Sequence, residues 1–260
     1  MEIFGRSLEF KMLFTKCRDL SKMFFKSLIF KDFGSLWLAY IKQTNPNQNK
    51  FITRDGYEIK LSNNPHDAIT VMVIFCRLEY GIVSPGSTVI DVGANIGVFS
   101  IYAARSGAAI VYAFEPNKES FDLLVNNIRI NKLEKTIIPF NLAVGAIDGE
   151  KISIPTSSSP YNKIVQGNIE LEHYDLVESI SLPTFIKKNN INNIDFLKMD
   201  CEGAEYGIIY SMTEENFKRI IKFRVEHHYP EEKQKLIQFF SQKGFKKTKD
   251  NGISIMWFDR

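Results

Sequence analysis

Residues 89–97 have the sequence Val-Ile-Asp-Val-Gly-Ala-Asn-Ile-Gly, in which a run of strand-forming residues breaks into a turn with a glycine at each end. Apolar residues continue from Val98 to Ala104, so the segment predicts a buried parallel strand that turns directly into a helix. Gly93 and Gly97 have no Cβ, which lets the backbone approach a ligand closely and lets the helix pack tightly on the strand. We therefore expect a nucleotide-type cofactor site to begin here.

The second predicted strand, Ala108 to Phe114, is followed by an acidic residue, Glu115. In a βαβ unit, an acidic side chain about 20 residues after the glycines accepts hydrogen bonds from ribose hydroxyls. Asn95 stands where the dinucleotide fingerprint has its second glycine, which disfavours a pyrophosphate on this helix. The sequence also contains no P-loop motif. The turn and Glu115 together indicate a ligand that carries a ribose.

Four segments resemble class I S-adenosylmethionine-dependent methyltransferases of the FkbM type. Residues 91–97 are similar to motif I of that class, and residues 114–116 (Phe-Glu-Pro) are similar to the acidic motif that follows it. Residues 196–205 (Phe-Leu-Lys-Met-Asp-Cys-Glu-Gly-Ala-Glu) resemble the D-x-E-G-x-E signature of the FkbM type. Residues 141–145 (Asn-Leu-Ala-Val-Gly) resemble the family's segment after the third strand. The resemblance covers roughly residues 67–258.

The resemblance implies S-adenosylmethionine as the cofactor and O-methylation of a sugar, a glycan or a small metabolite as the activity. The residues that we expect to bind the cofactor are Asp91, Gly93, Asn95, Gly97, Glu115, Asn141 and Ala143.

The order of predicted elements supports one doubly wound, Rossmann-like α/β domain of the class I methyltransferase type. The later strands are expected at residues 137–144, 151–155, 194–200 and 223–226, the helices at 117–131, 182–189 and 231–243, and a terminal antiparallel hairpin within 245–258. We expect residues 1–50 to form a basic, amphipathic helical extension with a linker. Residues 51–260 would form the methyltransferase domain, with an N-terminal hairpin at 51–66 and the motif-bearing core at 67–260.

Acidic residues gather where the fourth and fifth strands end, and ligands of open α/β sheets bind at such strand ends. Lys198 and Asp200 share one face of the fourth strand, and a buried lysine needs a partner, for which Asp200 is the nearest candidate. We expect Asp200 and Glu202 to face the substrate and Glu205 to order the turn. Glu226 would lie across the sheet opening from Asp200.

Asp200 is our first choice for the general base that removes a proton from the acceptor hydroxyl, with Glu226 or His227 next. His227 and His228 point opposite ways along a strand, so at most one of them would reach the site. Two carboxylates and a histidine could instead hold a divalent cation that orients a diol, so the sequence leaves metal dependence open.

Composition limits the possible partners. The chain has 260 residues, 44% of them hydrophobic, which is enough for a full core. The net charge of +3 is too small to argue for nucleic acid, and residues 1–50 hold 9 Lys or Arg against 4 Asp or Glu, so that +5 lies there and −2 in the rest. The three cysteines have no metal-ligand spacing, which favours reduced thiols in the cytoplasm.

The N-terminal extension allows two interpretations. Its basic and apolar residues could lie on an anionic membrane surface, or its helices could pack on the catalytic domain or on a second subunit. We favour packing. No apolar run in it is long enough for a signal-peptide core or a membrane span.

Two other functions remain open from sequence alone. An NAD(P)-dependent oxidoreductase shares the βαβ unit and the acidic residue, but it should carry the further glycine and usually lacks the terminal hairpin. A non-catalytic binding module on this scaffold would require a broken motif, whereas the motif residues are intact. We expect residues 157–174 to line the acceptor pocket, but they carry no interpretable motif, so the acceptor and the oligomeric state stay open.

Overall fold

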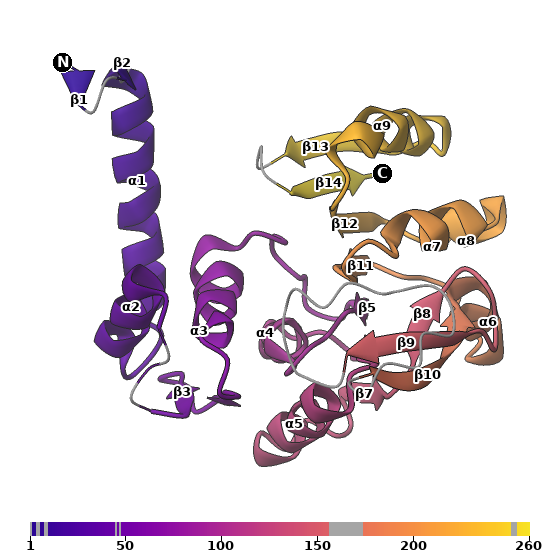
Figure 1. Ribbon diagram of the computed structural model, residues 1–260, viewed down its shortest axis with the longest axis horizontal. Helices are drawn as coiled ribbons and strands as arrows, with labels where there is room; N and C mark the ends of the chain where they lie inside the picture. The colour runs from indigo at the N-terminus through magenta and orange to yellow at the C-terminus, as the bar shows by residue number, and fades with distance from the viewer. Residues whose placement is uncertain are drawn as a thin grey trace.

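The apolar run before the glycine turn forms β5 (Thr88–Val92), an interior strand of a 7-stranded sheet (Figure 1). The strand order is β13-β14-β12-β11-β5-β6-β7. From β5 the chain builds outward to β6 and β7, and it then returns to the other side of β5 with β11 and β12, all of them parallel. The predicted doubly wound fold is therefore confirmed. The computed structural model describes residues 2–3, 6–7, 10–44, 46, 48–155, 174–250 and 254–260.

The remaining strands of this sheet are β6 (Ile110–Phe114), β7 (Ile137–Phe140), β11 (Phe196–Met199), β12 (Lys222–Glu226), β13 (Lys246–Asp250) and β14 (Ile255–Asp259). The last two pair antiparallel with each other, and β14 lies between β13 and β12. This is the terminal hairpin that the sequence predicts, although its turn at 251–253 lies outside the described residues.

Helices cover both faces of the sheet (Figure 1). After β5 along the chain these are α4 (Val98–Arg105), α5 (Lys118–Ile130), α6 (Leu182–Lys188), α7 (Glu205–Ser211), α8 (Glu214–Lys218), the 3-10 helix η2 (Pro230–Glu232) and α9 (Lys233–Gln242). The start of α5 follows from a local signal, because the side chain of Asn117 accepts a hydrogen bond from the Ser120 backbone N–H. The side chains of β11 alternate between the two faces, with Phe196 in one apolar cluster and Leu197 in the other.

The third predicted strand, residues 137–144, is wrong as a single element. It splits into β7 and β8 (Ala143–Gly145), and β8 belongs to a separate 3-stranded sheet of order β8-β10-β9. The break has a local cause, because the Asn141 side-chain amide donates to the carbonyls of Glu115 at 2.9 Å and Pro116 at 3.0 Å. The other two strands are β9 (Lys151–Pro155) and β10 (Tyr174–Ser181), of which only β9 is predicted.

The N-terminal segment contains β1 (Glu2–Ile3), β2 (Arg6–Ser7), α1 (Phe10–Ser27), α2 (Phe33–Lys42), β3 (Lys50–Ile52), β4 (Glu58–Lys60) and α3 (His66–Val71), which continues as a π-helix, η1 (Met72–Arg77). Strands β3 and β4 pair antiparallel, as the predicted hairpin requires. Helix α1 packs against η1, and α2 packs against α3. Phe30 and Leu36 are fully buried in the apolar cluster that also holds Val89 of β5.

In the described part of the chain, every helix is too short or too polar to cross a lipid bilayer.

The two glycines of the turn make close contacts inside the protein. Gly93 has φ of 77°, and a Cβ there would lie 1.7 Å from the carbonyl oxygen of Asp200 at the end of β11. Gly97 has φ of 90°, and a Cβ there would lie 2.5 Å from a Leu124 side-chain carbon of α5. The expected close approach therefore occurs, but the neighbour that requires a glycine is another strand end or helix of the protein.

We predict that Gly93→Ala destabilises the fold by about 3 kcal/mol or more, because it combines left-handed backbone strain with a steric clash. Gly86→Ala is the matched control, since Gly86 has φ of 78° and a Cβ added there would meet nothing within 4 Å. The strain alone should cost about 1 to 2 kcal/mol in that control. Urea denaturation of both variants measures the difference, and equal losses would contradict the assigned contact with β11.

Candidate active site

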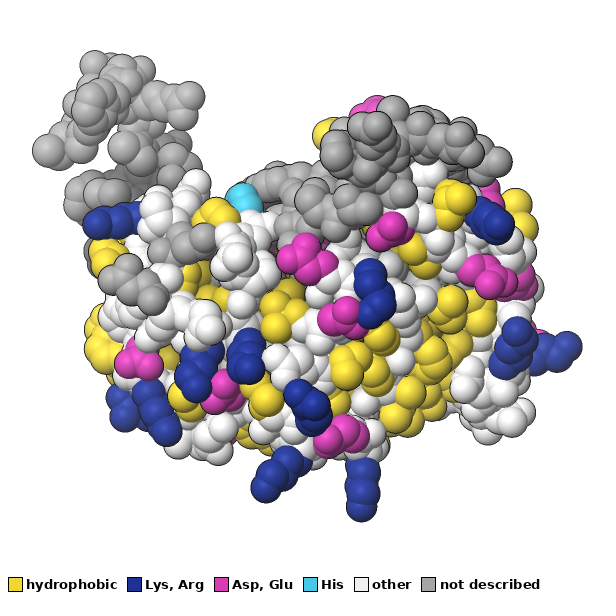
Figure 2. Space-filling view, turned by 60° about the horizontal axis from the view of Figure 1, so that its bottom comes forward, with side chains coloured by type: hydrophobic (Ala, Val, Ile, Leu, Met, Phe, Trp, Pro, Cys, Tyr) yellow, Lys and Arg dark blue, Asp and Glu magenta, His cyan; other side chains and the backbone are white. Residues whose placement is uncertain are grey.

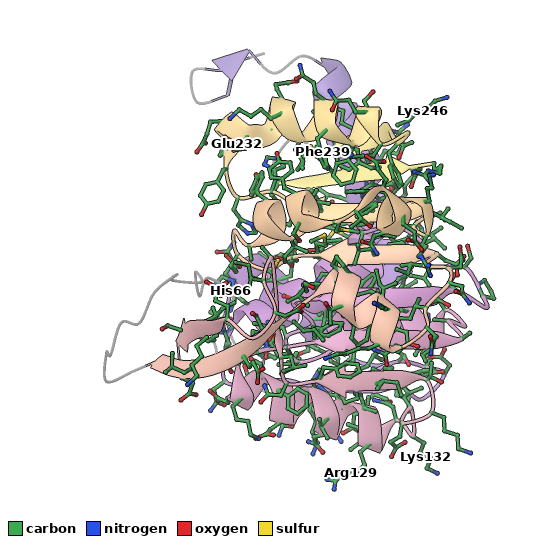
Figure 3. All side chains as sticks on the ribbon, turned by 90° about the vertical axis from the view of Figure 1, so that its right-hand side faces the viewer. His66, Arg129, Lys132, Glu232, Phe239 and Lys246 are labelled. Carbon is green, nitrogen blue, oxygen red and sulfur yellow. The ribbon has the colours of Figure 1, made fainter. Side chains whose placement is uncertain are left out.

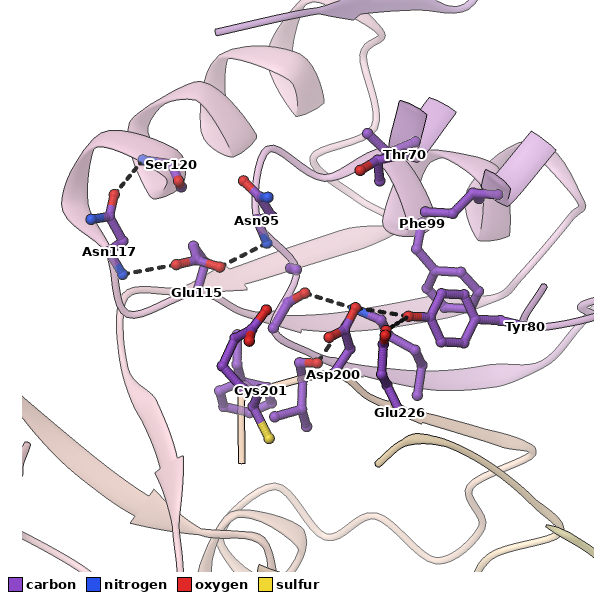
Figure 4. Close-up of a pocket in the computed structure, with 18 of the residues that line it drawn as sticks. Thr70, Tyr80, Asn95, Phe99, Glu115, Asn117, Ser120, Asp200, Cys201 and Glu226 are labelled. Atoms are coloured by element: carbon purple, nitrogen blue, oxygen red, sulfur yellow. Dashed lines mark hydrogen bonds and ion pairs between the residues drawn. The ribbon is translucent and has the colours of Figure 1, made fainter. Parts of the chain in front are cut away.

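A cavity of about 410 Å³ opens at the carboxyl ends of the parallel strands (Figure 4). One wall comes from α3 and η1, and the floor comes from the glycine turn and the ends of β5, β6, β11 and β12. Of the residues selected from the sequence, those that line the cavity are Gly93, Asn95, Glu115, Ala143, Lys198, Asp200, Glu202 and Glu226. Among the described residues, those that lie outside its lining are Asp91, Gly97, Asn141 and His227.

Glu115 lies at the end of β6 with its carboxylate held by two backbone N–H groups (Figure 4). The amide of Asn95 donates to Oε2 at 2.7 Å, and the amide of Asn117 donates to Oε1 at 2.8 Å. The residue is only 7% exposed. Burial raises the pKa of Glu115 to about 7, against the lowering effect of these two hydrogen bonds. The side-chain amide of Asn141 donates to the backbone carbonyl of Glu115 and so holds the backbone of that residue in place.

Asp91 and Lys198 form a buried ion pair, of which Lys198 lines the cavity. Lys198 Nζ lies 3.1 Å from Asp91 Oδ1 and 3.8 Å from Asp200 Oδ2, so Asp91 is the nearer partner, contrary to the sequence-based expectation. The other Asp91 oxygen accepts from the Ser100 hydroxyl at 2.7 Å. Lys198 also donates to the Gly93 carbonyl at 2.6 Å. Burial alone would lower the pKa of Lys198, but Asp91 and Asp200 raise it above its usual value, so the side chain stays charged.

Tyr80 joins the two carboxylates at the ends of β11 and β12 (Figure 4). Its hydroxyl lies 2.7 Å from Asp200 Oδ2 and 3.1 Å from Glu226 Oε2. A phenol has one proton to donate, so both contacts are satisfied at once only when one carboxyl is itself protonated. Burial, followed by the charge of Asp200, raises the pKa of Glu226 to about 7. Near neutral pH Glu226 is therefore protonated in only part of the molecules, and in that form it donates to the Tyr80 oxygen while Tyr80 donates to Asp200.

His228, and not His227, faces the acidic residues. His227 is buried at 4% exposure, outside the cavity lining formed by the described residues. His228 Nδ1 lies 3.1 Å from Glu205 Oε1, and its Nε2 lies 3.5 Å from Glu202 Oε2. Burial lowers the pKa of His228, but the hydrogen bond and charge of Glu205 outweigh it and raise the pKa to about 9. The two histidines thus point opposite ways, and the one that contacts the site is the second.

Glu205 orders the turn after β11, as expected from the sequence. Its Oε1 accepts from the Cys201 amide at 2.8 Å, and its Oε2 accepts from the Gly203 amide at 2.9 Å.

Oxygen and nitrogen atoms of Asp200, Glu226 and His228 lie within 4.8 Å of one another. Two carboxylates and an imidazole are a donor set that divalent cations accept, so this group could bind one.

Sequence reasoning misses Tyr80, selects His227 in place of His228, and gives no role to the wall formed by α3 and η1. Tyr80 lies 120 residues before Asp200 and is part of no motif, so nothing local indicates the contact. The sequence did contain a signal for His228: successive residues of a strand point to opposite faces, so only one of His227 and His228 can face the site. Of the predicted acceptor segment, residues 157–174, only Tyr174 at the start of β10 is among the described residues.

The family description "Methyltransferase FkbM domain" matches residues 91–247. Among curated proteins, the chain is 24% identical over 193 residues to the methyltransferase sdnD of Sordaria araneosa, covering 62% of this chain and 74% of that protein. It is 28% identical over 123 residues to the hexuronic acid methyltransferase AglP of Haloferax volcanii, covering 47% of this chain and 48% of that protein. The chain thus spans about half the length of AglP.

Shorter matches include a tRNA (guanine(37)-N(1))-methyltransferase of Batrachochytrium dendrobatidis, 34% identical over 76 residues, which are 29% of this chain and 16% of that protein. Among solved structures, the methyltransferase FkbM of Methylobacillus flagellatus aligns with a TM-score of 0.46 at 12% identity, covering 88% of this chain and 59% of that one.

The buried acid Glu115 generates a pH prediction for stability. Its pKa in the folded state is raised from 4.5 to about 7, so the folded state favours the protonated acid. The favourable effect on folding is complete at low pH and is lost as the pH rises through the folded pKa. Glu115→Gln, which does not titrate, should therefore gain about 3 kcal/mol of unfolding free energy relative to the wild type between about pH 4.5 and pH 8.

Urea denaturation across this pH range measures the gain for Glu115→Gln. Glu134→Gln, at an exposed position, controls for the loss of one negative charge. A difference between Glu115→Gln and the wild type that stays constant with pH would mean that Glu115 is not desolvated as described.

Proposed function

The chain belongs to the FkbM family of S-adenosylmethionine-dependent methyltransferases, and from this premise we propose that it methylates a hydroxyl oxygen of a sugar, a glycan or a small metabolite. The observation that carries the proposal is the pair Asp200 and Glu226, joined by Tyr80 beside the cavity. A hydroxyl is a weak nucleophile that must lose its proton during the transfer, and a partly buried carboxylate is a suitable group to take it.

The residues at the glycine-turn end of the cavity fit the cofactor. The Glu115 carboxylate can accept about four hydrogen bonds. The backbone amides of Asn95 and Asn117 occupy two of these positions. One acceptor position on each oxygen then remains for two adjacent ribose hydroxyls. Apolar residues line the same cavity and suit an adenine ring: Phe114, Leu142, Val144 and Ile154. The volume of about 410 Å³ lies within the usual range for such sites.

Charge at the other end of the cavity also fits. The bound cofactor supplies a methyl group on a positively charged sulfur. Asp200, Glu202 and Glu226 line this end, and Lys198 is already paired with Asp91 below it. Acidic side chains favour a cation nearby and disfavour a polyanion such as RNA. On the face in Figure 2, basic and acidic side chains are interspersed and form no single basic stripe.

In the proposed reaction, Asp200 accepts the proton of the acceptor hydroxyl while the oxygen forms its bond to the methyl carbon and the carbon–sulfur bond breaks. The Tyr80 hydroxyl donates to Asp200 Oδ2, and the Lys198 ammonium lies 3.8 Å from the same oxygen. Correct positioning can contribute about 7 to 11 kcal/mol to lowering such a barrier, and the base about a hundredfold in rate. Holding the reacting groups in place is thus the larger task.

The relatives support a small or sugar acceptor more than an RNA one. The two longer matches include a hexuronic acid methyltransferase, whereas the tRNA methyltransferase matches only 29% of this chain. Cys76 and Cys201 are free thiols, which suits the cytoplasmic setting that we propose.

Calorimetric titration separates the proposed cofactor from the two alternative functions. We predict that S-adenosylmethionine and S-adenosylhomocysteine each bind the full chain at one site, and that NAD does not. Binding of NAD alone would support the oxidoreductase, and binding of none of the three would support a non-catalytic module.

Replacing Asp200 by Asn should lower turnover about a hundredfold or more while leaving the affinity for S-adenosylhomocysteine within about twofold, because the base is lost and the cofactor contacts are kept. Turnover is measured as labelled methyl transferred to a panel of hexuronic acids, neutral sugars, small alcohols and tRNA. Asp122→Asn is the control, an exposed carboxylate of α5 paired with Lys118. Full activity of Asp200→Asn would remove Asp200 from catalysis.

The same assay with a chelator separates a base from a cation site at Asp200, Glu226 and His228. Turnover that a chelator leaves unchanged supports the base. Turnover that is lost and then restored by Mg²⁺ or Mn²⁺ would assign the group to a bound cation that orients the acceptor.

A further inference from the structure

The N-terminal helices present apolar side chains to solvent. On α1, Leu20 is 52% exposed, Phe24 43% and Phe25 69%, and on α2, Leu38 is 53% and Ile41 69% exposed. Single exposed apolar residues are normal on a protein surface, but a connected group of this kind marks an interaction site. We call these five residues the outer face of the two helices.

Side-chain contacts connect the outer face across both helices. Phe24 packs edge-on against Phe25, with ring centroids 6.0 Å apart, and its ring lies 6.2 Å from that of Trp37 on α2. Trp37 and Ile41 are one helical turn apart, as are Leu20 and Phe24, so that each pair lies on one side of its helix. Phe24 of the outer face thus contacts Trp37 of α2, which lies one helical turn before Ile41.

The same two helices are already anchored on their inner sides. Met23, Phe30, Leu36 and Ala39 are buried in the main apolar cluster. Their position at one edge of the molecule, beyond α3, is visible in Figure 1. The packing that we favour from the sequence is thus present, and the outer face remains exposed in addition to it.

Basic residues outnumber acidic ones in the segment that carries the outer face. Residues 18–42 contain 5 Lys or Arg and 2 Asp or Glu, which gives +3 on this short segment. Arg18, Lys22, Lys31 and Lys42 are exposed. Apolar side chains with basic residues beside them are the pattern of a helix that lies in the interface of an anionic bilayer. A second copy of the chain would bring the same positive charge to the contact, which disfavours self-association through this face.

We propose that the outer face of α1 and α2 docks on an anionic lipid surface. Helices α1 and α2 pack on η1 and α3, and the latter two form a wall of the cavity. Docking would therefore hold this wall next to the bilayer, within reach of an acceptor carried by a lipid or an amphiphile. The proposal concerns where the protein acts, and it stands whatever hydroxyl is methylated.

Vesicle flotation of the full chain tests the proposal. We expect binding to vesicles of phosphatidylcholine with about 30% phosphatidylglycerol, little binding to pure phosphatidylcholine, and release at about 0.5 M salt. Ile41→Ser should weaken binding about tenfold, and its matched control is Ile147→Ser, which removes an isoleucine that is 63% exposed in a turn after β8. Lys22→Glu should also weaken binding, whereas Lys132→Glu should not, because Lys132 follows the end of α5 and projects from the bottom of the molecule in Figure 3, away from α1.

Calorimetric binding of S-adenosylhomocysteine by each variant shows that it is folded, independently of vesicles and of acceptor. Absence of vesicle binding by the wild type would overturn the proposal. Binding that is equal for Ile41→Ser and Ile147→Ser would also overturn it, as would a dimer in light scattering that Ile41→Ser dissociates.

Discussion

The buried ammonium of Lys198 is the group on which the geometry of the site depends. It is 3% exposed, and it links the Asp91 carboxylate of β5, the carbonyl of the glycine turn and the Asp200 carboxylate at the end of β11. Because a buried charge without its partner costs about 3 to 5 kcal/mol, this ion pair holds the two strand ends together. Gly93 permits the approach, since any side chain there would meet the Asp200 carbonyl.

Patterns within one strand and turn were readable from sequence, and contacts between distant segments were not. The β5 turn, the acid after β6 and the terminal hairpin follow from local residue types and period. Tyr80 could not be found, because its contact with Asp200 spans 120 residues. His227 was chosen in place of His228 because β12 ends at Glu226, before either histidine. Past the end of a strand, a shift of one residue changes which of two neighbouring side chains faces the site. The break after β7 depends on a side-chain amide, Asn141, that no periodicity reveals.

Burial sets the chemistry at both ends of the cavity. It raises the pKa of Glu115 and of Glu226 to about 7, so that both acids change charge near the pH at which cells work. Hydroxyl groups placed on Glu115 would stabilise its ionised form, and a positive sulfur beside Asp200 and Glu226 would do the same for that pair. Cofactor binding and the ionisation of the base are therefore expected to support each other. In the proposed reaction, the same fold would position a ribose at one end of the cavity and a proton acceptor at the other.

A crystal structure of the full chain with S-adenosylhomocysteine tests the central claim most directly. The account predicts that both ribose hydroxyls lie within hydrogen-bond distance of the Glu115 carboxylate and that the sulfur faces Asp200, with space between them for an acceptor oxygen. A ribose bound elsewhere, or a sulfur directed away from Asp200, would contradict it.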